Sequence, residues 1–336
     1  MIPPLAPTFD AALRDVRAQQ PRFRRAAAAR LGEPPPGREG EALEGVLSLC
    51  GDAEGEVRAA AFESLGMLEA GDARAALQAG FEDRYPPARQ AAVLALGRVD
   101  PENAALDIAP LLADPRPDMR FSAVWTLSLL GAEHAAAIAG ALTDEDPEVR
   151  LLSAQCLGDL EALAYVDAIA SLLEDPRDEV RFAAATALAG LGDSRAAAPL
   201  RAALTHRERA FAAAVGLGDL EDGASHAALG RLAKQRFRSP ILRAAAARAL
   251  VRLGDPEGAW IIQKLVRSWR IEARQYAAQL VGELGLVALV PDLAKGLRRG
   301  SNAERAVYQA ALELLAPKSN EAKALLASIQ PADHPE

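Results

Sequence analysis

The chain has 336 residues, of which half are apolar and only 4% aromatic, and its formal net charge is −8. Its two cysteines, Cys50 and Cys156, lie far apart and form no CxxC pair, so we expect reduced core residues of a cytoplasmic protein rather than a disulfide framework. No cationic segment followed by an apolar run opens the chain, and no apolar run approaches the roughly 18 residues of a membrane span, so neither a signal peptide nor a membrane protein is expected.

The N-terminal residues 1–46 are predicted to form an atypical cap with one short helix. This cap contains a degenerate copy of the repeat described below, RRAAAARLGE, which begins at Arg24. The PPPG sequence that follows cannot continue a helix. We expect a regular array over residues 47–330 and a disordered, polar tail over residues 331–336.

A repeat with a period near 31 residues fills this array. Several copies begin with an acidic, Pro-containing stretch, and most continue into an Ala/Leu-rich helix and turn near a Gly into a second helix. A fixed period of this length predicts a solenoid in which each unit packs on its neighbours, here with about nine to ten helix pairs. The anchor arginines of the copies are Arg58, Arg89, Arg120, Arg150, Arg181, Arg243, Arg274 and Arg305, and one further copy has Ala210 in this place.

The pattern within each copy predicts two amphipathic helices. Three residues after the anchor the chain has Ala or Ser, and seven and ten residues after it Leu or Val, which together form one face of an α-helix. Only the last copy departs, with Tyr308 in place of the small residue. Apolar residues at offsets 16, 19, 22 and 23 predict the second helix. Since neither helix can bury its apolar face alone, the units must stack.

One stretch, DPEVRLLSAQCLGDLEALAYVDAIASLLEDPRDEVRFAAATALAGLGDSRAAAPLRAAL, resembles the short HEAT repeats first named from phycobilin lyases. The resemblance covers roughly residues 50–330 and implies an all-α, ARM/HEAT-like superhelical α-solenoid. It also implies a ladder between neighbouring units, formed by the repeated Arg and the turn Asp, for example Arg181 with Asp193 and Arg243 with Asp255. A third implication is that the second helix of each pair lines the concave surface.

No catalytic or metal-binding motif is present. The chain has no HExxH, P-loop, GxGxxG or GxSxG, and no two of its four histidines share a helical face at a spacing of four. Deoxyhypusine hydroxylase, a HEAT-repeat enzyme, holds iron with His-Glu dipeptides, whereas this chain has only the reversed pair Glu133-His134. Because a shared repeat does not carry an activity with it, we predict a protein that is not an enzyme and has no catalytic residues, metal or cofactor.

The charges are unevenly distributed. Residues 101–200 contain 6 basic and 17 acidic residues, a net charge of −11, whereas residues 201–300 contain 17 basic and 9 acidic residues, a net charge of +8. In the basic part, cations recur at offsets 21 and 24 of the second helices, which are not apolar offsets, and one copy adds a tryptophan at offset 17. Three of the five lysines are among them. We name these residues the basic stripe: Arg231, Lys234, Trp260, Lys264, Arg267, Lys295 and Arg298.

We therefore predict a scaffold or adaptor that binds a protein partner through an acidic, extended or helical segment along the basic stripe. The competing interpretation is a solvated basic face without a ligand. Nucleic-acid binding is an alternative, because arginine and lysine beside tryptophan suit phosphates and bases; the net charge of −8 opposes it. Further alternatives are association between the acidic and basic parts of two copies and a bilin-lyase-like or other accessory role. The sequence defines neither the partner nor the oligomeric state.

Overall fold

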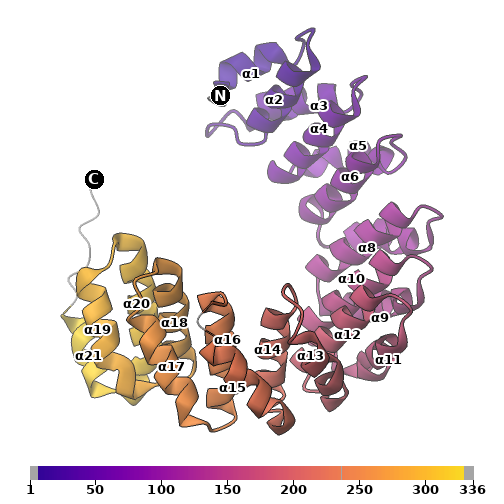
Figure 1. Cartoon of the computed structure of the whole chain (residues 1–336). Coiled ribbons are helices and arrows are strands. Elements are labelled where there is room, and N and C mark those ends of the chain that lie inside the picture. Colours follow the sequence, from indigo (N-terminus) through magenta and orange to yellow (C-terminus); the bar gives the residue numbers. More distant parts are fainter. Residues whose placement is uncertain (1–6, 236, 329–336) are drawn as a thin grey trace. The chain divides into compact units, whose positions relative to one another are not determined.

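The computed structural model describes residues 7–235 and 237–328 (Figure 1), and every regular element in these residues is a helix. A short helix, α1 (Phe9–Asp15), precedes ten helix pairs, which confirms the predicted all-α array. The first helices of the pairs are α2 (Pro21–Leu31), α4 (Gly55–Met67), α6 (Pro86–Val99), α8 (Pro117–Leu130), α10 (Pro147–Asp159), α12 (Asp178–Gly190), α14 (Ala210–Asp219), α16 (Pro240–Arg252), α18 (Ile271–Glu283) and α20 (Asn302–Leu315). The second helices are α3 (Glu39–Leu49), α5 (Arg74–Gly80), α7 (Ala104–Ile108), α9 (Ala135–Gly140), α11 (Val166–Ser171), α13 (Ala197–Ala203), α15 (His226–Lys234), α17 (Pro256–Val266), α19 (Val290–Arg299) and α21 (Asn320–Ala327).

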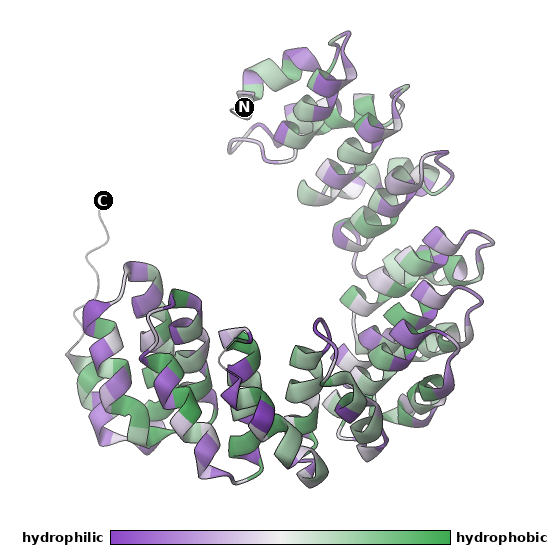
Figure 2. Cartoon of the chain, viewed as in Figure 1, coloured by the Kyte–Doolittle hydropathy of each residue, from purple (hydrophilic) through white to green (hydrophobic). Residues whose placement is uncertain are grey.

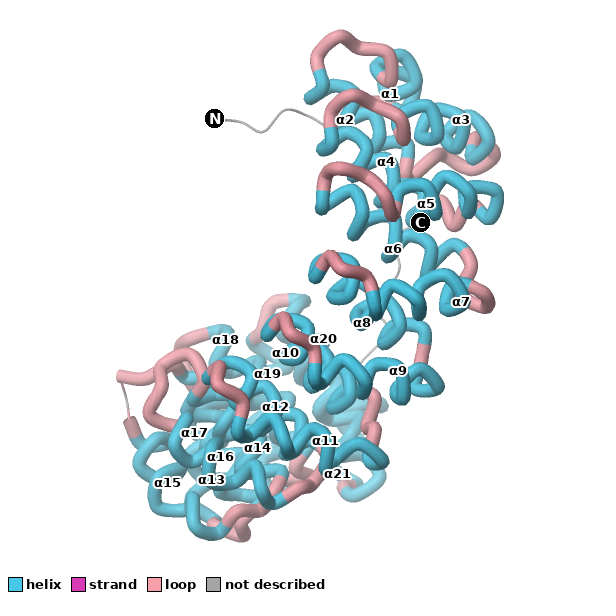
Figure 3. Tube along the Cα trace, turned by 90° about the vertical axis from the view of Figure 1, so that its right-hand side faces the viewer, coloured by secondary structure: helices cyan, strands magenta, loops and turns pink. Residues whose placement is uncertain are grey.

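The chain divides into two compact units, the N-terminal unit (residues 1–183) and the C-terminal unit (residues 184–336). The predicted boundary after residue 46 is not a structural one, because that residue lies inside α3, which packs against α2. The degenerate copy RRAAAARLGE therefore opens a complete helix pair. The predicted tail, residues 331–336, lies outside the described residues, as does the end of the predicted array. Figure 3 shows the loops that join successive helices.

The core lies between the two helices of each pair and between successive pairs. At offsets 3 and 7 the side chains are fully or almost fully buried in all nine anchored copies, from Ala61 and Leu65 to Tyr308 and Leu312. The residues at offset 10 end the first helix or follow it directly, and all of them except Leu315 are only half-buried. Figure 2 shows apolar residues along the helices and hydrophilic ones in many of the loops.

The first helices end on a repeated backbone turn. At offset 11, seven copies place a residue with positive φ, a conformation that suits glycine. Four of these residues are glycines, and three are glutamates with φ near 50°. At Glu161, where φ is 51°, the next amide, that of Ala162, donates to the carbonyl oxygen of Leu157 at 3.0 Å and so closes the helix. The turn directs the chain into the second helix.

The anchor arginines form a ladder, but with other partners than predicted. In several copies the anchor guanidinium pairs with an acid 24–30 residues later, near the start of the next helix pair. Each such ion pair is a rung of the ladder. Arg58 is typical: its Nε and Nη2 atoms donate to Asp83 at 2.6 Å. The rungs are Arg24–Asp52, Arg58–Asp83, Arg89–Asp118, Arg120–Asp144, Arg150–Asp175 and Arg274–Glu304.

The two pairs implied by the resemblance are wrong. Arg181 pairs with Asp178, and Arg243 donates to the carbonyl oxygen of Ala233. The turn aspartates have partners closer to their own turns: Asp193 pairs with Arg195, and Asp255 with His226. The physical reason is that the anchor guanidinium commonly lies along the loop before its own helix, where its Nη1 atom donates to loop carbonyls, as in Arg58, Arg120 and Arg181. This loop contacts the next loop of its kind, and the Gly turn is at the opposite end of the helix.

Within the C-terminal unit the helices form two layers (Figure 1). Successive first helices α14, α16, α18 and α20 pack directly on one another, whereas the second helices α15, α17 and α19 touch each other only slightly. The closely packed layer of a curved array lies on its inner side, and the splayed layer on its outer side. The second helices of this unit therefore lie on its convex side, and the predicted concave position of these helices is wrong here.

Candidate functional site

The basic stripe lies on three successive second helices of the C-terminal unit. All seven side chains are exposed. Most of the cations lie near the C-terminal ends of these helices, where positive charge complements the helix dipole. The members are Arg231 and Lys234 on α15, Trp260 and Lys264 on α17, Arg267 at the C-terminal cap of α17, and Lys295 and Arg298 on α19.

Two of the six cations are neutralised by carboxylates. The Lys234 Nζ atom lies 2.8 Å from Glu257 Oε2. Arg267 donates through Nε and Nη2 to Asp292, at 2.7 and 2.9 Å. Asp292 is only 5% exposed, and the hydrogen bonds from Arg267 hold the pKa of its carboxyl below the usual value, against the effect of burial. Arg267 is therefore partly structural, since it satisfies a buried charge of the next helix pair.

The other four cations have no ion-pair partner among residues 7–235 and 237–328; these are Arg231, Lys264, Lys295 and Arg298. Lys264 instead places its ammonium 3.3 Å from the ring centroid of Trp260, whose side chain is half-exposed. A cation over an indole face is held in place without losing its charge. Solvated cations on three neighbouring helices can attract an anionic surface.

The structure brings part of the stripe together around two hollows. The first, of about 510 Å³, is lined by Lys234, Trp260 and Lys264 together with the anchor Arg243 and the acidic Glu257. It lies between α15 of one helix pair and α16 and α17 of the next, and it combines an aromatic face with cations of both neighbouring second helices. Arg231 and Arg298 line neither hollow.

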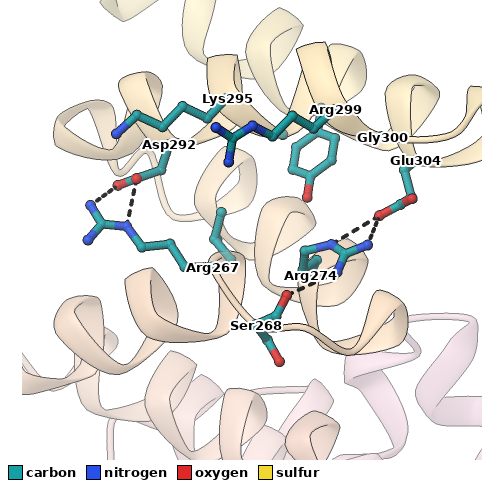
Figure 4. Close-up of a pocket in the computed structure, with 11 residues that line it drawn as sticks. Arg267, Ser268, Arg274, Asp292, Lys295, Arg299, Gly300 and Glu304 are labelled. Carbon is teal, nitrogen blue, oxygen red and sulfur yellow. Dashed lines mark hydrogen bonds and ion pairs between the residues drawn. The ribbon is translucent and has the colours of Figure 1, made fainter.

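The second hollow, of about 550 Å³, lies one helix pair further along the chain (Figure 4). It includes Arg267 and Lys295 of the stripe and also residues that the sequence reasoning missed: Arg299, Arg274 and Tyr308. No periodic signal identifies Arg299, because the equivalent places in the two preceding pairs hold Gln235 and Ser268. Tyr308 is marked in the sequence only by its departure from the small residue at offset 3.

Aromatic side chains at the loop edge of this unit add to the exposed surface. Trp269 is 83% exposed, with the Arg270 guanidinium 5.1 Å from its ring centroid. Phe237, which the sequence reasoning did not select, is fully exposed in the preceding loop of the same kind. In the N-terminal unit, Trp125 is 41% exposed and so partly packed.

Among the described residues, the titratable side chains form no second candidate site. Within the described ranges, no group of three or more His, Cys, Asp or Glu side chains is placed to hold a metal ion. The aspartates whose pKa is held low, such as Asp52 and Asp83, accept hydrogen bonds from ladder arginines, which lower the pKa more than burial raises it. Burial raises the pKa of the Cys50 thiol to about 12. The part of the chain that the structure describes includes no helix both long and apolar enough to cross a bilayer.

Comparison with known proteins gives one family match. A family model described as HEAT repeats matches residues 135–217. No curated protein matches the chain.

Among solved structures, YibA of Escherichia coli is 18% identical, over 85% of this chain and 99% of that one, with a TM-score of 0.49. A chain of the CpcE–CpcF complex of phycocyanin lyase from Nostoc sp. PCC7120 is 18% identical, over 77% of this chain and 94% of that one, with a TM-score of 0.37. Human deoxyhypusine hydroxylase in complex with glycerol is 24% identical, over 72% of this chain and 93% of that one, with a TM-score of 0.32. Similarity at this level of identity and TM-score is no evidence for a shared activity. The HEAT match itself lies within an array of ten helix pairs in the described residues, most of them in one sequence register, and the chain therefore contains HEAT repeats.

Proposed function

We propose that this chain is a non-catalytic adaptor that binds an acidic segment of a partner protein at the basic stripe. The observation that carries the proposal is the group formed by Trp260, Lys264 and the first hollow. A half-exposed tryptophan is held beneath a lysine ammonium, next to a concavity that a side chain can enter. Tryptophan and arginine beside a pocket are the residue types that dominate binding energy at protein interfaces.

The charge distribution favours a discrete acidic segment over a long polyanion. Lys234 and Arg267 are already paired with carboxylates, so the unpaired cations are separated along the stripe. A nucleic-acid backbone presents evenly spaced phosphates and gains affinity from each cation that it neutralises. An acidic peptide instead needs only a few matched positions. The convex position of the second helices agrees with this, because an outer face presents local hollows rather than one long groove.

Catalysis forms no part of the proposal. Among the described residues, the carboxylates with a lowered pKa lie in ion pairs, helix caps or turns, which are structural positions. Two of them, Asp292 and Glu304, line the second hollow, and there each is held in an ion pair, with Arg267 and Arg274.

The test is a charge reversal, Lys264→Glu with Arg298→Glu, against the matched control Lys318→Glu with Lys323→Glu, which lies outside the stripe. The probe is a fluorescently labelled glutamate-rich peptide, measured by anisotropy near 0.15 M salt and again at higher salt. We expect the stripe variant to bind at least about tenfold more weakly and with less salt dependence. The control variant should bind as the wild type does. The free energy of unfolding should change little in either variant, because a single solvated charge contributes little to stability.

Three other outcomes would overturn the proposal. Equal binding by the two variants would mean that the stripe is only a solvated face. Preference for a labelled single-stranded DNA of the same length would favour the nucleic-acid alternative. Association of the wild type with itself at rising concentration, abolished in the stripe variant, would identify the partner as a second copy of the chain.

A further inference from the structure

The second hollow has an unusual balance of charge. Four cations line it, Arg267, Arg274, Lys295 and Arg299, together with two carboxylates. Figure 4 shows Arg267 turned toward Asp292 and Arg274 toward Glu304, with Lys295 and Arg299 on the opposite side of the hollow. The two ion pairs cancel, and the lining keeps a net charge of +2.

The two cations that supply this excess charge, Lys295 and Arg299, take part in no ion pair of the described residues that stabilises the fold. Arg267 and Arg274 are held by Asp292 and Glu304, at distances of 2.7 and 2.5 Å. Lys295 and Arg299, both exposed on α19, have no hydrogen-bond or ion-pair partner in the described part of the chain. Cations that the fold does not use, beside a concavity, are available to a ligand.

A second, independent feature is a buried hydroxyl whose proton has no acceptor. Tyr308 is only 1% exposed, and the one group beside its hydroxyl oxygen among the described residues is the Arg274 guanidinium, which can donate to it but cannot accept its proton. The ring packs against Gly296 and depends on the lack of a side chain there, since a Cβ atom on this residue would lie 2.4 Å from Cζ of the tyrosine. A buried polar group without a partner costs free energy, and in a native structure it commonly marks an absent ligand, water or functional role. The site is therefore built, and one donor in it is unsatisfied.

The hydroxyl is kept protonated and thus able to donate. Burial raises the pKa of Tyr308, while the positive charge of Arg274 and a hydrogen bond with it oppose the shift. A tyrosine in this state donates to an anion and does not compete with it as a negative charge. Its proton has no acceptor among the described residues.

We propose that the second hollow binds a phosphoryl group, either as free phosphate or on a phosphorylated side chain of the partner. A phosphate monoester carries a charge near −2 at neutral pH and has three strong acceptor oxygens. This matches the net charge of the lining, and the guanidinium of Arg299, the ammonium of Lys295 and the hydroxyl of Tyr308 supply donors from different directions. A carboxylate, with one charge and two coplanar oxygens, would leave part of the set unused. The free-phosphate form is independent of the proposed adaptor function, whereas the phosphorylated-partner form rests on it.

The first measurement is a calorimetric titration of the whole purified chain with inorganic phosphate at constant ionic strength, with acetate as the carboxylate comparison. We expect saturable binding with a Kd of about 1 mM for phosphate and at least tenfold weaker binding of acetate. Arg299→Gln should weaken phosphate binding at least about tenfold, as expected for a lost charge-assisted hydrogen bond. Arg305→Gln is the matched control, an exposed arginine of α20 that does not line the hollow, and should leave the Kd unchanged.

Tyr308→Phe separates a ligand-binding role from a structural one. Without phosphate, this variant should unfold at about the same temperature as the wild type or a higher one, because the hydroxyl that it removes has no acceptor for its proton and Arg274 keeps its ion pair with Glu304. With phosphate, the rise in unfolding temperature should be clearly smaller than in the wild type. A variant that is destabilised without phosphate, but responds to it as the wild type does, would overturn the role of the hydroxyl.

The source of the group is decided by a third arm, a phosphoserine peptide compared with the same peptide carrying glutamate instead. Binding of the phosphopeptide at least tenfold tighter than that of free phosphate, with competition between them, would assign the site to a phosphorylated partner. Binding of phosphate alone would assign it to the free ion. No saturable phosphate binding, equal binding of acetate, or equal losses in Arg299→Gln and Arg305→Gln would refute the phosphoryl site. Each of these results would leave the adaptor proposal standing, because that proposal is tested with an unphosphorylated acidic peptide and with variants outside this hollow.

Discussion

Replacing the anchor arginine of one well-formed rung should destabilise the protein strongly. The Arg58 side chain is 8% exposed, as is that of its partner Asp83, and two hydrogen bonds of 2.6 Å join them. Its Nη1 atom also donates to the carbonyl oxygens of Asp52 and Ala53, at 2.7 and 3.1 Å. The substitution Arg58→Met keeps much of the apolar length of the side chain and removes all of these donors.

The expected loss of stability follows from the carboxylate that the substitution leaves without its partner. After the substitution the buried Asp83 carboxylate keeps only the hydrogen bond from the Tyr85 amide, at 2.8 Å. Removal of one partner from a buried ion pair costs about 3–5 kcal/mol, because the other charge remains buried without compensation. The double variant Arg58→Met with Asp83→Leu should recover most of this loss, since an apolar pair in the same place is commonly neutral.

The assay is urea unfolding followed by circular dichroism, with the free energy obtained by linear extrapolation. Arg181→Met is the matched control, an anchor of the same register whose side chain is 38% exposed and whose partner Asp178 is 56% exposed. Exposed pairs contribute about 0–1 kcal/mol, so the control should change little. A loss below about 1 kcal/mol for Arg58→Met, or an equal loss in both variants, would refute the view that the ladder joins successive pairs through buried charge.

Two further predictions concern acid sensitivity and the repeated turn. The guanidinium of Arg58 holds the pKa of Asp83 below its ordinary value, so this pair stabilises the fold fully above the unfolded pKa of about 3.9, and its contribution is lost as the pH falls through the lower folded pKa. Urea midpoints should therefore fall as the medium is acidified below about pH 4, and less steeply for Asp83→Asn; equal slopes would argue against this assignment. Glu161 has φ of 51°, so Glu161→Gly should relieve the left-handed strain and stabilise the chain by about 0.5 kcal/mol in thermal unfolding, and a loss of stability would contradict that reasoning.

The sequence predicts the helix pairs well because the burial pattern is local. Positions such as Leu157 and Leu188 follow from the 3.6-residue period alone, and both are completely buried. The exposure of the basic stripe follows in the same way, because offsets 21 and 24 avoid the apolar face. These are properties of single helices, which a periodic pattern describes fully.

Properties that depend on contacts between helix pairs are not predictable in this way. The rung of Arg58 uses Asp83 because both side chains lie in neighbouring loops, and the spacing of rungs varies from 24 to 30 residues, so no fixed offset identifies the acid. The curvature of the C-terminal unit depends on which layer is more closely packed, whereas periodicity identifies only the face that each helix buries. Arg299 and Tyr308 meet across two helix pairs, and no single copy of the repeat contains both.

The fit of Tyr308 against Gly296 limits how freely the repeats of this chain could be exchanged. At the place that Gly296 takes in α19, the two preceding second helices have Leu232 and Leu265, both buried. If α20 were moved to follow either of those helices, its tyrosine would face a leucine in a space that was filled by leucine and alanine. Duplication or shuffling of single units would therefore have to move α19 and α20 together. The smallest interchangeable module at this end of the chain is then the second helix of one pair with the first helix of the next, rather than the helix pair itself.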